Sequence, residues 1–292
     1  MDITVLYNPN STGDSKAYAQ KFRDAFVQAD GKKAHKITLL ATKHAGHAEE
    51  IAAEYAAKTQ PHILISSSGD GGYHELINGA LAQKSSKLIV GLLPAGNAND
   101  HYNALDITVD ETVQNILANT PKTVDVLRIS AKVGGKSWVR YAHSYAGIGV
   151  VAKAAKDITK ERPNLITEKW LVAKSLLSFR YVKIRENGKN RRYSSLIFSN
   201  VRVMSKALTL AGNASLTDGK FEINRIRFRS KLRLLTYLLT AATVGLTPSK
   251  TATKARFTTT KPTAIQLDGE VVTIDARCNV TVEIMPKKLR YV

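Results

Sequence analysis

The stretch SSSGDGGYHELINGAL, Ser66 to Leu81, decides the fold of the first half of the chain. An apolar run, Ile63 to Ser66, leads directly into Gly69-Asp70-Gly71-Gly72, and a helical pattern containing Glu75 follows. Such a strand, loop and helix present backbone N–H groups at a helix N-terminus, where the helix dipole favours anions. A carboxylate beside a phosphate repels it unless Mg²⁺ lies between them. The stretch therefore predicts a loop for a metal–nucleotide complex, and a plain strand-to-helix turn remains the alternative.

The first 125 residues alternate between strand and helix patterns. The expected strands are 3–7, 36–40, 62–66, 87–93 and 123–129, and the expected helices are 15–29, 47–58, one through Glu75, and 110–119. This alternation predicts right-handed crossovers and a parallel sheet with helices on both faces. Ligands bind such sheets at the carboxyl ends of the strands. We therefore expect an α/β N-terminal domain at 1–125.

The pattern changes after Asp125. The expected strands are 139–145, 194–202, 221–229, 256–260, 264–267 and 279–285, with Gly-containing turns between several of them. Two helical stretches, 167–179 and 231–244, interrupt the strands. This predicts a mostly antiparallel, β-sandwich-like domain at 126–292.

The excess of positive over negative charge lies entirely in the second half. Residues 1–130 contain 12 Lys+Arg and 14 Asp+Glu, whereas residues 131–292 contain 31 and 10. A surface this basic attracts nucleic acid or an anionic membrane. Zinc-finger spacing, a basic zipper and an RNP-like aromatic-basic run are all missing from the sequence, so we expect no nucleic-acid partner. A basic surface without a specific partner remains an alternative.

The segment 232–246 is apolar and is flanked by Lys231, Arg233 and Lys250. It is shorter than the about 20 residues that span a bilayer. Two interpretations stay open, a helix packed in the core and a surface that docks on lipid. The single cysteine, Cys278, and the missing signal-like N-terminus favour a reducing cytoplasm.

A second loop, PAGNAND (94–100), follows another apolar strand. We expect Asn97 and Asn99 to donate to phosphate oxygens, Gly96 to allow close backbone approach, and Asp100 to add a carboxylate. NPNSTG (8–13) follows the first strand. Three strand ends would then surround one ligand.

With these motifs the sequence resembles the diacylglycerol kinase and sphingosine kinase superfamily, especially its small bacterial lipid kinases. The resemblance rests on Asn8-Pro9-Asn10-Ser11, Thr42, Ser68-Gly69-Asp70-Gly71 with Glu75, Pro94 to Asp100, Val124-Asp125-Val126, Thr217-Asp218-Gly219 and Leu267-Asp268-Gly269-Glu270. It implies an ATP- and Mg²⁺-dependent lipid kinase with a nucleotide-binding domain, a lipid-substrate domain, and the active site in the cleft between them.

The resemblance also implies a role for each matching residue. The expected nucleotide contacts are Asn8, Pro9, Asn10, Ser11, Lys16, Thr42, Ser68, Gly69, Asp70, Gly71, Gly72, Glu75, Gly96, Asn97 and Asn99. The expected metal ligands are Asp70, Asp100, Asp125 and, in a structural metal site, Asp218.

Asp268 and Glu270 are the expected catalytic pair, with Asp268 as the base. Along an extended chain, residues two apart face the same side, so one carboxylate could accept the hydroxyl proton while the other orients the substrate or its metal. An aspartate that only caps its own Asp-Gly turn is the alternative.

The sequence departs from the family pattern at two positions of the first loop. The loop usually reads Gly-Gly-Asp-Gly-Thr, whereas Ser68 replaces the first glycine here and Gly72 the threonine, which is nearer the sphingosine kinase pattern. Ala98 likewise stands where relatives have a hydroxyl. A non-catalytic lipid-binding homologue therefore stays open.

The motifs also separate this sequence from other kinase classes. A P-loop is excluded because Ser130 stands where the first glycine before Gly135-Lys136-Ser137 should be. NAD kinases share a Gly-Asp-Gly loop, but the basic second half and the apolar segment favour a lipid. Diacylglycerol is the expected substrate, with sphingoid bases and polyprenols as alternatives.

The expected partners are the lipid substrate and an anionic membrane surface. The expected location is cytoplasmic, peripherally on the inner face of the membrane. A homodimer is left open.

Overall fold

The computed structural model describes residues 2–11, 13–31, 35–83, 87–161, 171, 174–176, 178–248 and 250–292. The chain forms two compact units, unit 1 (Met1–Asp125 with Pro286–Val292) and unit 2 (Val126–Met285). The sequence assignment of 126–292 to one domain is corrected at its C-terminal end. The last strand, β17 (Asn279–Tyr291), reaches β4 (Ile89–Pro94), where Tyr291 pairs with Val90 inside unit 1.

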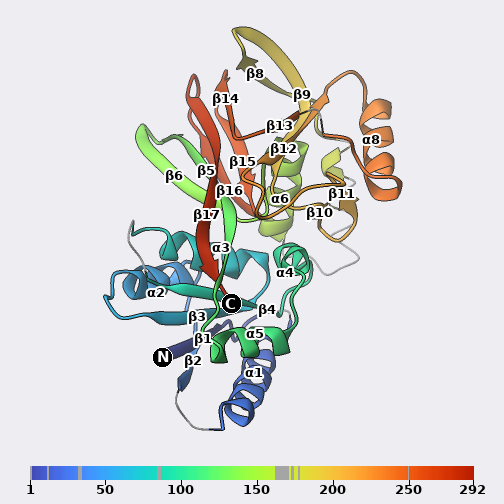
Figure 1. The fold of residues 1–292 in the computed structure, drawn as a ribbon. Coiled ribbons are helices and arrows are strands. Elements are labelled where there is room, and N and C mark those ends of the chain that lie inside the picture. The colour runs from blue at the N-terminus through green and yellow to red at the C-terminus, as the bar shows by residue number, and fades with distance from the viewer. Residues whose placement is uncertain are drawn as a thin grey trace. The chain divides into compact units, whose positions relative to one another are not determined.

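Unit 1 contains the predicted parallel sheet (Figure 1). Its strands lie in the order β2 (Lys36–Ala41), β1 (Asp2–Tyr7), β3 (His62–Ser68) and β4, and all neighbours are parallel. The helices are α1 (Ser15–Asp30), α2 (His47–Ala56), α3 (Asp70–Ala80), α4 (Asp100–Leu105) and α5 (Val109–Leu117). The expected alternation is confirmed from β1 to α5, and α4 is an additional short helix. The last expected strand, 123–129, is β5 (Lys122–Val133), which pairs with β6 (Lys136–Ala142) and β17 instead of joining the parallel sheet.

The helices cover both faces of this sheet, as the sequence predicts. Side chains alternate across a strand, so Ile3, Val5 and Ile63 point to one face, where Phe22 and Phe26 of α1 pack on them. On the other face α3 packs closely on α2 because residue 79 is glycine. A Cβ at Gly79 would lie 2.2 Å from the carbonyl oxygen of Glu49.

The buried start of β3 makes the stability of unit 1 sensitive to acid. His62 packs against the Tyr55 ring with centroids 4.2 Å apart, and its Nε2 lies 3.0 Å from Thr4 Oγ1. Burial, aided by the nearby Lys58 charge, lowers the pKa of His62 from 6.5 to about 4. The neutral ring is therefore favoured in the folded state. Its contribution to stability is complete above pH 6.5 and is lost as the pH falls through about 4.

We expect His62→Gln to flatten the acid-side fall of the thermal midpoint between pH 6.5 and 4. Thermal unfolding of both proteins across this range measures it. Parallel curves would remove His62 from the acid response.

Unit 2 is built from antiparallel strands, as expected. They are the part of β5 (Lys122–Val133) beyond residue 125, β6 (Lys136–Ala142), β7 (Tyr145–Gly149), β8 (Val182–Glu186), β9 (Lys189–Ser199), β12 (Phe221–Arg227), β13 (Lys250–Ala252), β14 (Lys254–Thr259), β15 (Thr263–Leu267), β16 (Glu270–Ile274) and the first part of β17, with a small pair β10 (Val203–Met204) and β11 (Leu208–Thr209). The two described helices are α6 (Val150–Glu161) and α8 (Lys231–Thr243). The core lies along one face of the strands, around Phe198, Phe221 and Phe257.

The structure differs from the sequence expectations at two places in unit 2. The single strand expected at 139–145 is two strands, β6 and β7, separated at His143-Ser144. The helix α6 follows Gly149, whose φ of +92° turns the chain out of β7. The helix expected at 167–179 lies mostly outside the described residues. Within the described part of the chain, no helix is long and apolar enough to cross a membrane.

Candidate active site

Three loops meet at the carboxyl edge of the parallel sheet, after β1, β3 and β4. Their contacts are made by glycine backbone. A Cβ at Gly96 would lie 2.2 Å from the Cα of Gly69, and a Cβ at Gly13 would lie 2.1 Å from the carbonyl oxygen of Ala95. Side chains at these positions would force the loops apart, so the structure brings together the three loops that the sequence predicts around one ligand.

Serine hydroxyls tie the segment after β1 to the end of β3. Ser67 Oγ donates to the carbonyl oxygen of Ser15 at 2.7 Å, and the Ser15 hydroxyl donates back to the carbonyl oxygen of Ser67. The N–H of Asn8 donates to Ser15 Oγ at 3.0 Å. The start of α1 is therefore fixed against the strand that leads into the Gly-Asp-Gly loop.

Asp70 links the Gly-Asp-Gly loop after β3 to the loop 94–100 after β4. Its two carboxylate oxygens accept the N–H groups of Asp100 and His101, each at 3.2 Å, at the start of α4. Asp70 thus shapes the site and brings the Asp100 backbone to it. The predicted part of both residues in holding Mg²⁺ stays a prediction.

We expect Asp70→Ala to lower both Mg²⁺–ATP affinity and stability, because two N–H groups lose their acceptors, at about 1–3 kcal/mol for each buried unsatisfied group. Asp70→Asn keeps an acceptor oxygen but no charge, so it should recover part of the stability and little of the affinity. Calorimetric ATP titration and thermal unfolding measure the two effects. Full nucleotide affinity in both variants would make Asp70 purely structural.

The expectation that Asn99 donates to a phosphate is not met. Its Nδ2 donates to the carbonyl oxygens of Pro94 and Gly96, at 3.2 and 2.9 Å, and its Oδ1 accepts the N–H of Gly96 at 3.0 Å. This side chain holds the loop in shape. Asn97 is exposed beside it, and its contact with phosphate stays a prediction.

The other expected nucleotide residues of unit 1 lie at the same sheet edge. Thr42 follows β2, and its N–H and hydroxyl both donate to the carbonyl oxygen of Tyr7, at 2.8 and 3.4 Å. Glu75 accepts the N–H of Gly46 at 2.9 Å, which caps the start of α2. The β1–α1 segment supplies the remaining residues, Asn8, Pro9, Asn10, Ser11 and Lys16. Their contact with nucleotide stays a prediction.

Asp125 lies at the end of unit 1 and is buried. Its Oδ1 accepts the N–H of Lys287 at 2.7 Å, so it fastens the C-terminal segment to unit 1. Its predicted part in holding Mg²⁺ stays a prediction.

In unit 2, the carboxylate of Asp268 is fixed by backbone N–H groups. It accepts from His143, Ser144 and Tyr145 at 2.9, 3.0 and 3.0 Å, and its side chain is fully buried. Two of these bonds reach Oδ1 and one reaches Oδ2. His143 Nε2 lies 3.4 Å from Oδ2. These N–H groups point to Asp268 instead of a neighbouring strand, which is why the expected strand 139–145 is interrupted.

Glu270 does not share a face with Asp268 in the way the sequence predicts. Asp268 and Gly269 have φ of +49° and +100° and form a two-residue hairpin turn, in which Leu267 pairs with Glu270. The chain reverses between the two carboxylates instead of running extended. Glu270 is exposed and forms an ion pair with Arg140 at 3.3 Å. Its catalytic role stays a prediction.

Asp218 forms an exposed turn in which its Oδ1 accepts the N–H of Lys220 at 3.0 Å. The buried Glu222 lies close enough for the Asp218 charge to act on its carboxyl group. Burial first, and the Asp218 charge second, raise the pKa of Glu222 above its usual range. A cation near this pair would favour the ionised carboxyl, which fits the expected structural metal site, and that site stays a prediction.

His143 is the residue of this constellation that sequence reasoning missed. It is completely buried, and its Nδ1 lies 2.8 Å from the Ser144 hydroxyl. The available signal was the polar pair His143-Ser144 inside an otherwise strand-like run, which a continuous strand does not require.

The two departures in the first loop have one steric explanation. A Cβ at Gly72 would lie 2.6 Å from Ser68 Oγ and 2.7 Å from Ser68 Cβ. The same space therefore admits a side chain from position 68 or from position 72. Ser68 fills it here, and its hydroxyl lies 2.6 Å from Ser66 Oγ.

Known proteins resemble this chain both in sequence and in fold. Residues 2–129 match the model of the diacylglycerol kinase catalytic domain. Diacylglycerol kinases of Staphylococcus aureus strains JH9 and NCTC 8325 / PS 47 are 31% identical over 106 residues, which is 36% of this chain and 32% of theirs. The match thus spans about a third of the length of these curated relatives.

The fold comparison covers more of the chain. The crystal structure of a diacylglycerol kinase from Bacillus anthracis str. Sterne is similar with a TM-score of 0.70, at 18% identity, over 100% of this chain and 96% of that one. The family-model match lies within the first half of the chain, and the likeness of fold extends over both units.

Proposed function

We propose, from the premise that this chain belongs to the diacylglycerol kinase superfamily, that it is an ATP-dependent lipid kinase. It transfers the γ-phosphate of ATP to the hydroxyl of a lipid alcohol, with diacylglycerol as the first candidate and phosphatidic acid as the product. The observation that carries this proposal is the meeting of three glycine-containing loops at one sheet edge, with Asp70 joined to the start of α4.

Unit 1 supplies the nucleotide site. Gly69 and Gly96 leave no side chain between the loops, so phosphate oxygens can approach backbone N–H groups at the start of α3. The exposed Asn97 and Lys16 add donors at the rim. Mg²⁺, when bound by Asp70 and Asp100, would neutralise charge on the phosphate oxygens.

Unit 2 supplies the acceptor side of the reaction. Asp268 Oδ2 accepts the hydroxyl proton of the lipid alcohol as its oxygen bonds to the γ-phosphorus and the bond from that phosphorus to the ADP oxygen breaks. Oδ1 is occupied by two N–H groups, so it fixes the carboxylate and leaves proton transfer to Oδ2. His143, 3.4 Å from Oδ2, is placed to share that proton.

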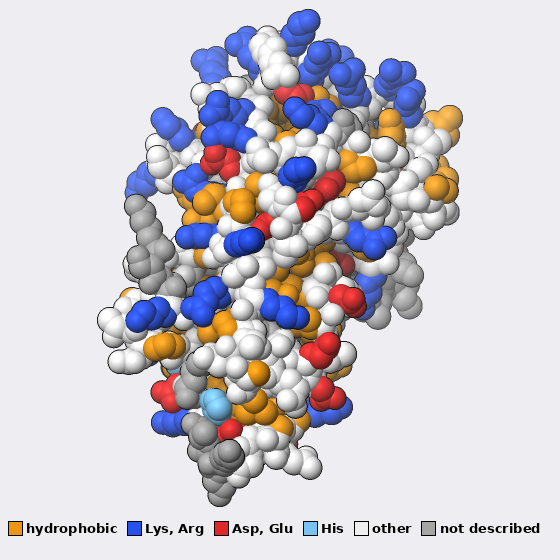
Figure 2. All heavy atoms as spheres, in the orientation of Figure 1, with side chains coloured by type: hydrophobic (Ala, Val, Ile, Leu, Met, Phe, Trp, Pro, Cys, Tyr) orange, Lys and Arg blue, Asp and Glu red, His pale blue; other side chains and the backbone are white. Residues whose placement is uncertain are grey.

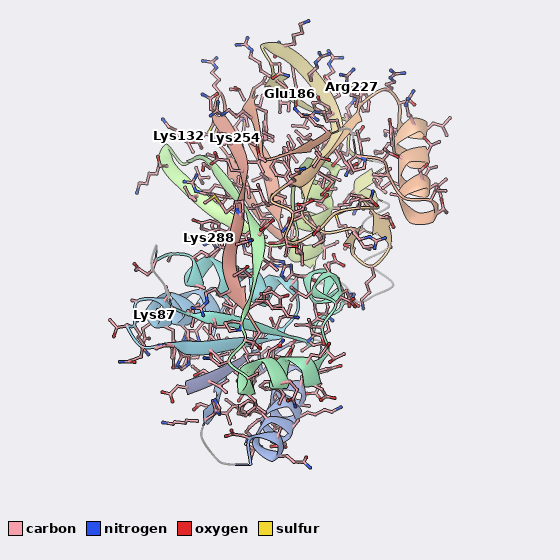
Figure 3. The ribbon with its side chains drawn as sticks, in the orientation of Figure 1. Lys87, Lys132, Glu186, Arg227, Lys254 and Lys288 are labelled. Atoms are coloured by element: carbon pink, nitrogen blue, oxygen red, sulfur yellow. The ribbon has the colours of Figure 1, made fainter. Side chains whose placement is uncertain are left out.

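The substrate lies in the membrane, so the protein would work peripherally on the inner face of an anionic membrane in the cytoplasm. The basic side chains of unit 2 support this proposal. Of those labelled in Figure 3, Lys132, Arg227 and Lys254 belong to unit 2, and Lys87 and Lys288 to unit 1.

Transfer of labelled γ-phosphate from ATP to separate acceptors tests the proposal. The panel contains diacylglycerol, a sphingoid base, a polyprenol and NAD, each with Mg²⁺ and with EDTA. Label in diacylglycerol that requires Mg²⁺ is the expected result. Label in another lipid keeps the kinase and changes its substrate, label in NAD assigns a soluble substrate, and no label with any acceptor, while ATP still binds, indicates a non-catalytic homologue.

A further inference from the structure

The helix α8 is apolar on two opposite faces. Leu234 and Ala241 are buried, and Leu234 packs with Val150 and Ile226 of unit 2. Leu232, Leu235 and Leu239, spaced by three and four residues, form a second stripe on the other side. Their exposed fractions are 72, 51 and 56%.

This second stripe is unusual for a protein surface. Val244, Leu232 and Leu239 are the three most exposed large hydrophobic residues in the part of the chain that the structure describes. Figure 2 shows hydrophobic side chains gathered at the edge where Figure 1 has α8. A contiguous exposed apolar patch marks a surface that meets a partner.

The charges around α8 select an anionic partner. Between Glu222 and Asp268 the chain has nine Lys or Arg and no Asp or Glu. Four of the nine stand exposed at or just before the start of α8: Arg227, Arg229, Lys231 and Arg233. Figure 2 shows further Lys and Arg side chains gathered over the same end of unit 2. An apolar stripe with a basic rim matches the boundary between acyl chains and anionic head groups.

The threonine hydroxyls on the outer face of α8 already have hydrogen-bond acceptors within the helix. Thr236, Thr240 and Thr243 are exposed, and each hydroxyl donates to a carbonyl oxygen in the preceding turn, at 2.8, 2.9 and 2.7 Å. A hydroxyl that keeps such a bond avoids the cost of entering lipid without a partner. The helix can therefore present this face to acyl chains with its hydrogen bonds intact.

We propose that α8 docks in the plane of an anionic leaflet. Leu232, Leu235 and Leu239 enter the acyl boundary, and Lys231 and Arg233 remain at the phosphate level. This inference rests on the proposed function, which needs a membrane surface, and deepens it by naming the helix that docks; the binding itself requires neither ATP nor turnover.

Sedimentation with vesicles tests the docking surface. The full chain is mixed with vesicles of phosphatidylcholine alone or with phosphatidylglycerol added, at low and high salt. We expect binding to the anionic vesicles, partial release by salt because exposed charges are screened, and a salt-resistant remainder from the apolar stripe. Equal binding to both kinds of vesicle would overturn the charged rim.

Three variants separate the two contributions. Leu235→Gln with Leu239→Gln should remove the salt-resistant remainder and weaken binding about tenfold. Lys231→Gln with Arg233→Gln should weaken only the salt-sensitive part. Val27→Gln is the matched control, because Val27 on α1 is exposed to the same 51% as Leu235, and it should bind like the parent protein. Unchanged thermal midpoints confirm that the variants are folded.

Wild-type binding by the double leucine variant would overturn the proposal. The proposal would also be overturned if the parent protein were a dimer and the double leucine variant a monomer, because the apolar stripe would then join two copies of the chain. Vesicle binding without any phosphate transfer keeps this inference and counts against the kinase. Phosphate transfer to detergent-dispersed lipid without vesicle binding would support the kinase and contradict the docking of α8.

Discussion

Asp268→Asn is expected to lower kcat by about 10²–10⁴-fold, the usual contribution of a general base, while ATP affinity stays near that of the parent protein. An amide of the same volume cannot take the proton of the acceptor hydroxyl. The loops proposed to bind nucleotide all belong to unit 1, so the substitution is expected to leave them unchanged. Phosphate transfer to the accepted lipid and calorimetric ATP titration measure the two quantities.

Asp268→Asn should also reduce stability, and this effect must be distinguished from the loss of kcat. An Asn oxygen can still accept from Ser144 and Tyr145, but its NH₂ then faces the N–H of His143. Some loss of stability is therefore expected, and kcat is compared at a temperature where both proteins are folded. Normal kcat in the variant would remove Asp268 from the base role.

Glu270→Gln is the matched control in the same hairpin. Glu270 is exposed and pairs with Arg140, so its neutral variant should keep the fold. A small change in kcat is expected if Asp268 alone is the base. A loss as large as that of Asp268→Asn would restore Glu270 to the catalytic pair expected from the sequence.

Gly96→Ala is expected to abolish nucleotide binding and to destabilise unit 1. The added Cβ would lie 2.2 Å from the Cα and 2.9 Å from the nitrogen of Gly69, and backbone cannot move aside as a flexible side chain does. Overpacking of this kind costs about 1–3 kcal/mol and separates the two loops. ATP titration and thermal unfolding measure both losses.

Two other glycines provide controls for this variant. Gly71 lies in the first turn of α3, next to the Gly69 that Gly96 faces, and a Cβ there meets nothing within 4 Å, so Gly71→Ala should keep the stability. It should lower ATP affinity if phosphates lie close to the start of α3. Gly212 in unit 2 is equally open, and Gly212→Ala should change neither property. Normal ATP binding by Gly96→Ala would contradict the assignment of these loops to the nucleotide.

The hairpin at Asp268-Gly269 shows what the local sequence alone cannot predict. Asp268-Gly269 predicts a turn, because these residues tolerate positive φ, and the turn is present. The idea that Asp268 and Glu270 share a face assumed an extended chain, which the same turn rules out. Choosing between these two local patterns required the pairing of β15 with β16.

The sequence by itself determined the architecture of unit 1 and the position of its loops. Alternating strand and helix patterns force a parallel sheet, and a parallel sheet puts all its strand ends on one edge. The glycines then mark where those loops can touch. These signals are local in the sequence, so they can be identified without knowing any long-range contact.

Only the tertiary structure decided what the polar side chains do. Asp70 accepts N–H groups thirty residues away, Asp268 accepts them from residues more than 120 positions earlier, and Asn99 closes its own loop instead of facing outward. The outer stripe of α8 is apolar in sequence like any core segment, and only the packing of Leu234 and Ala241 shows which face is left exposed. A side chain's partners depend on which distant segments fold beside it, and neither composition nor periodicity contains that information.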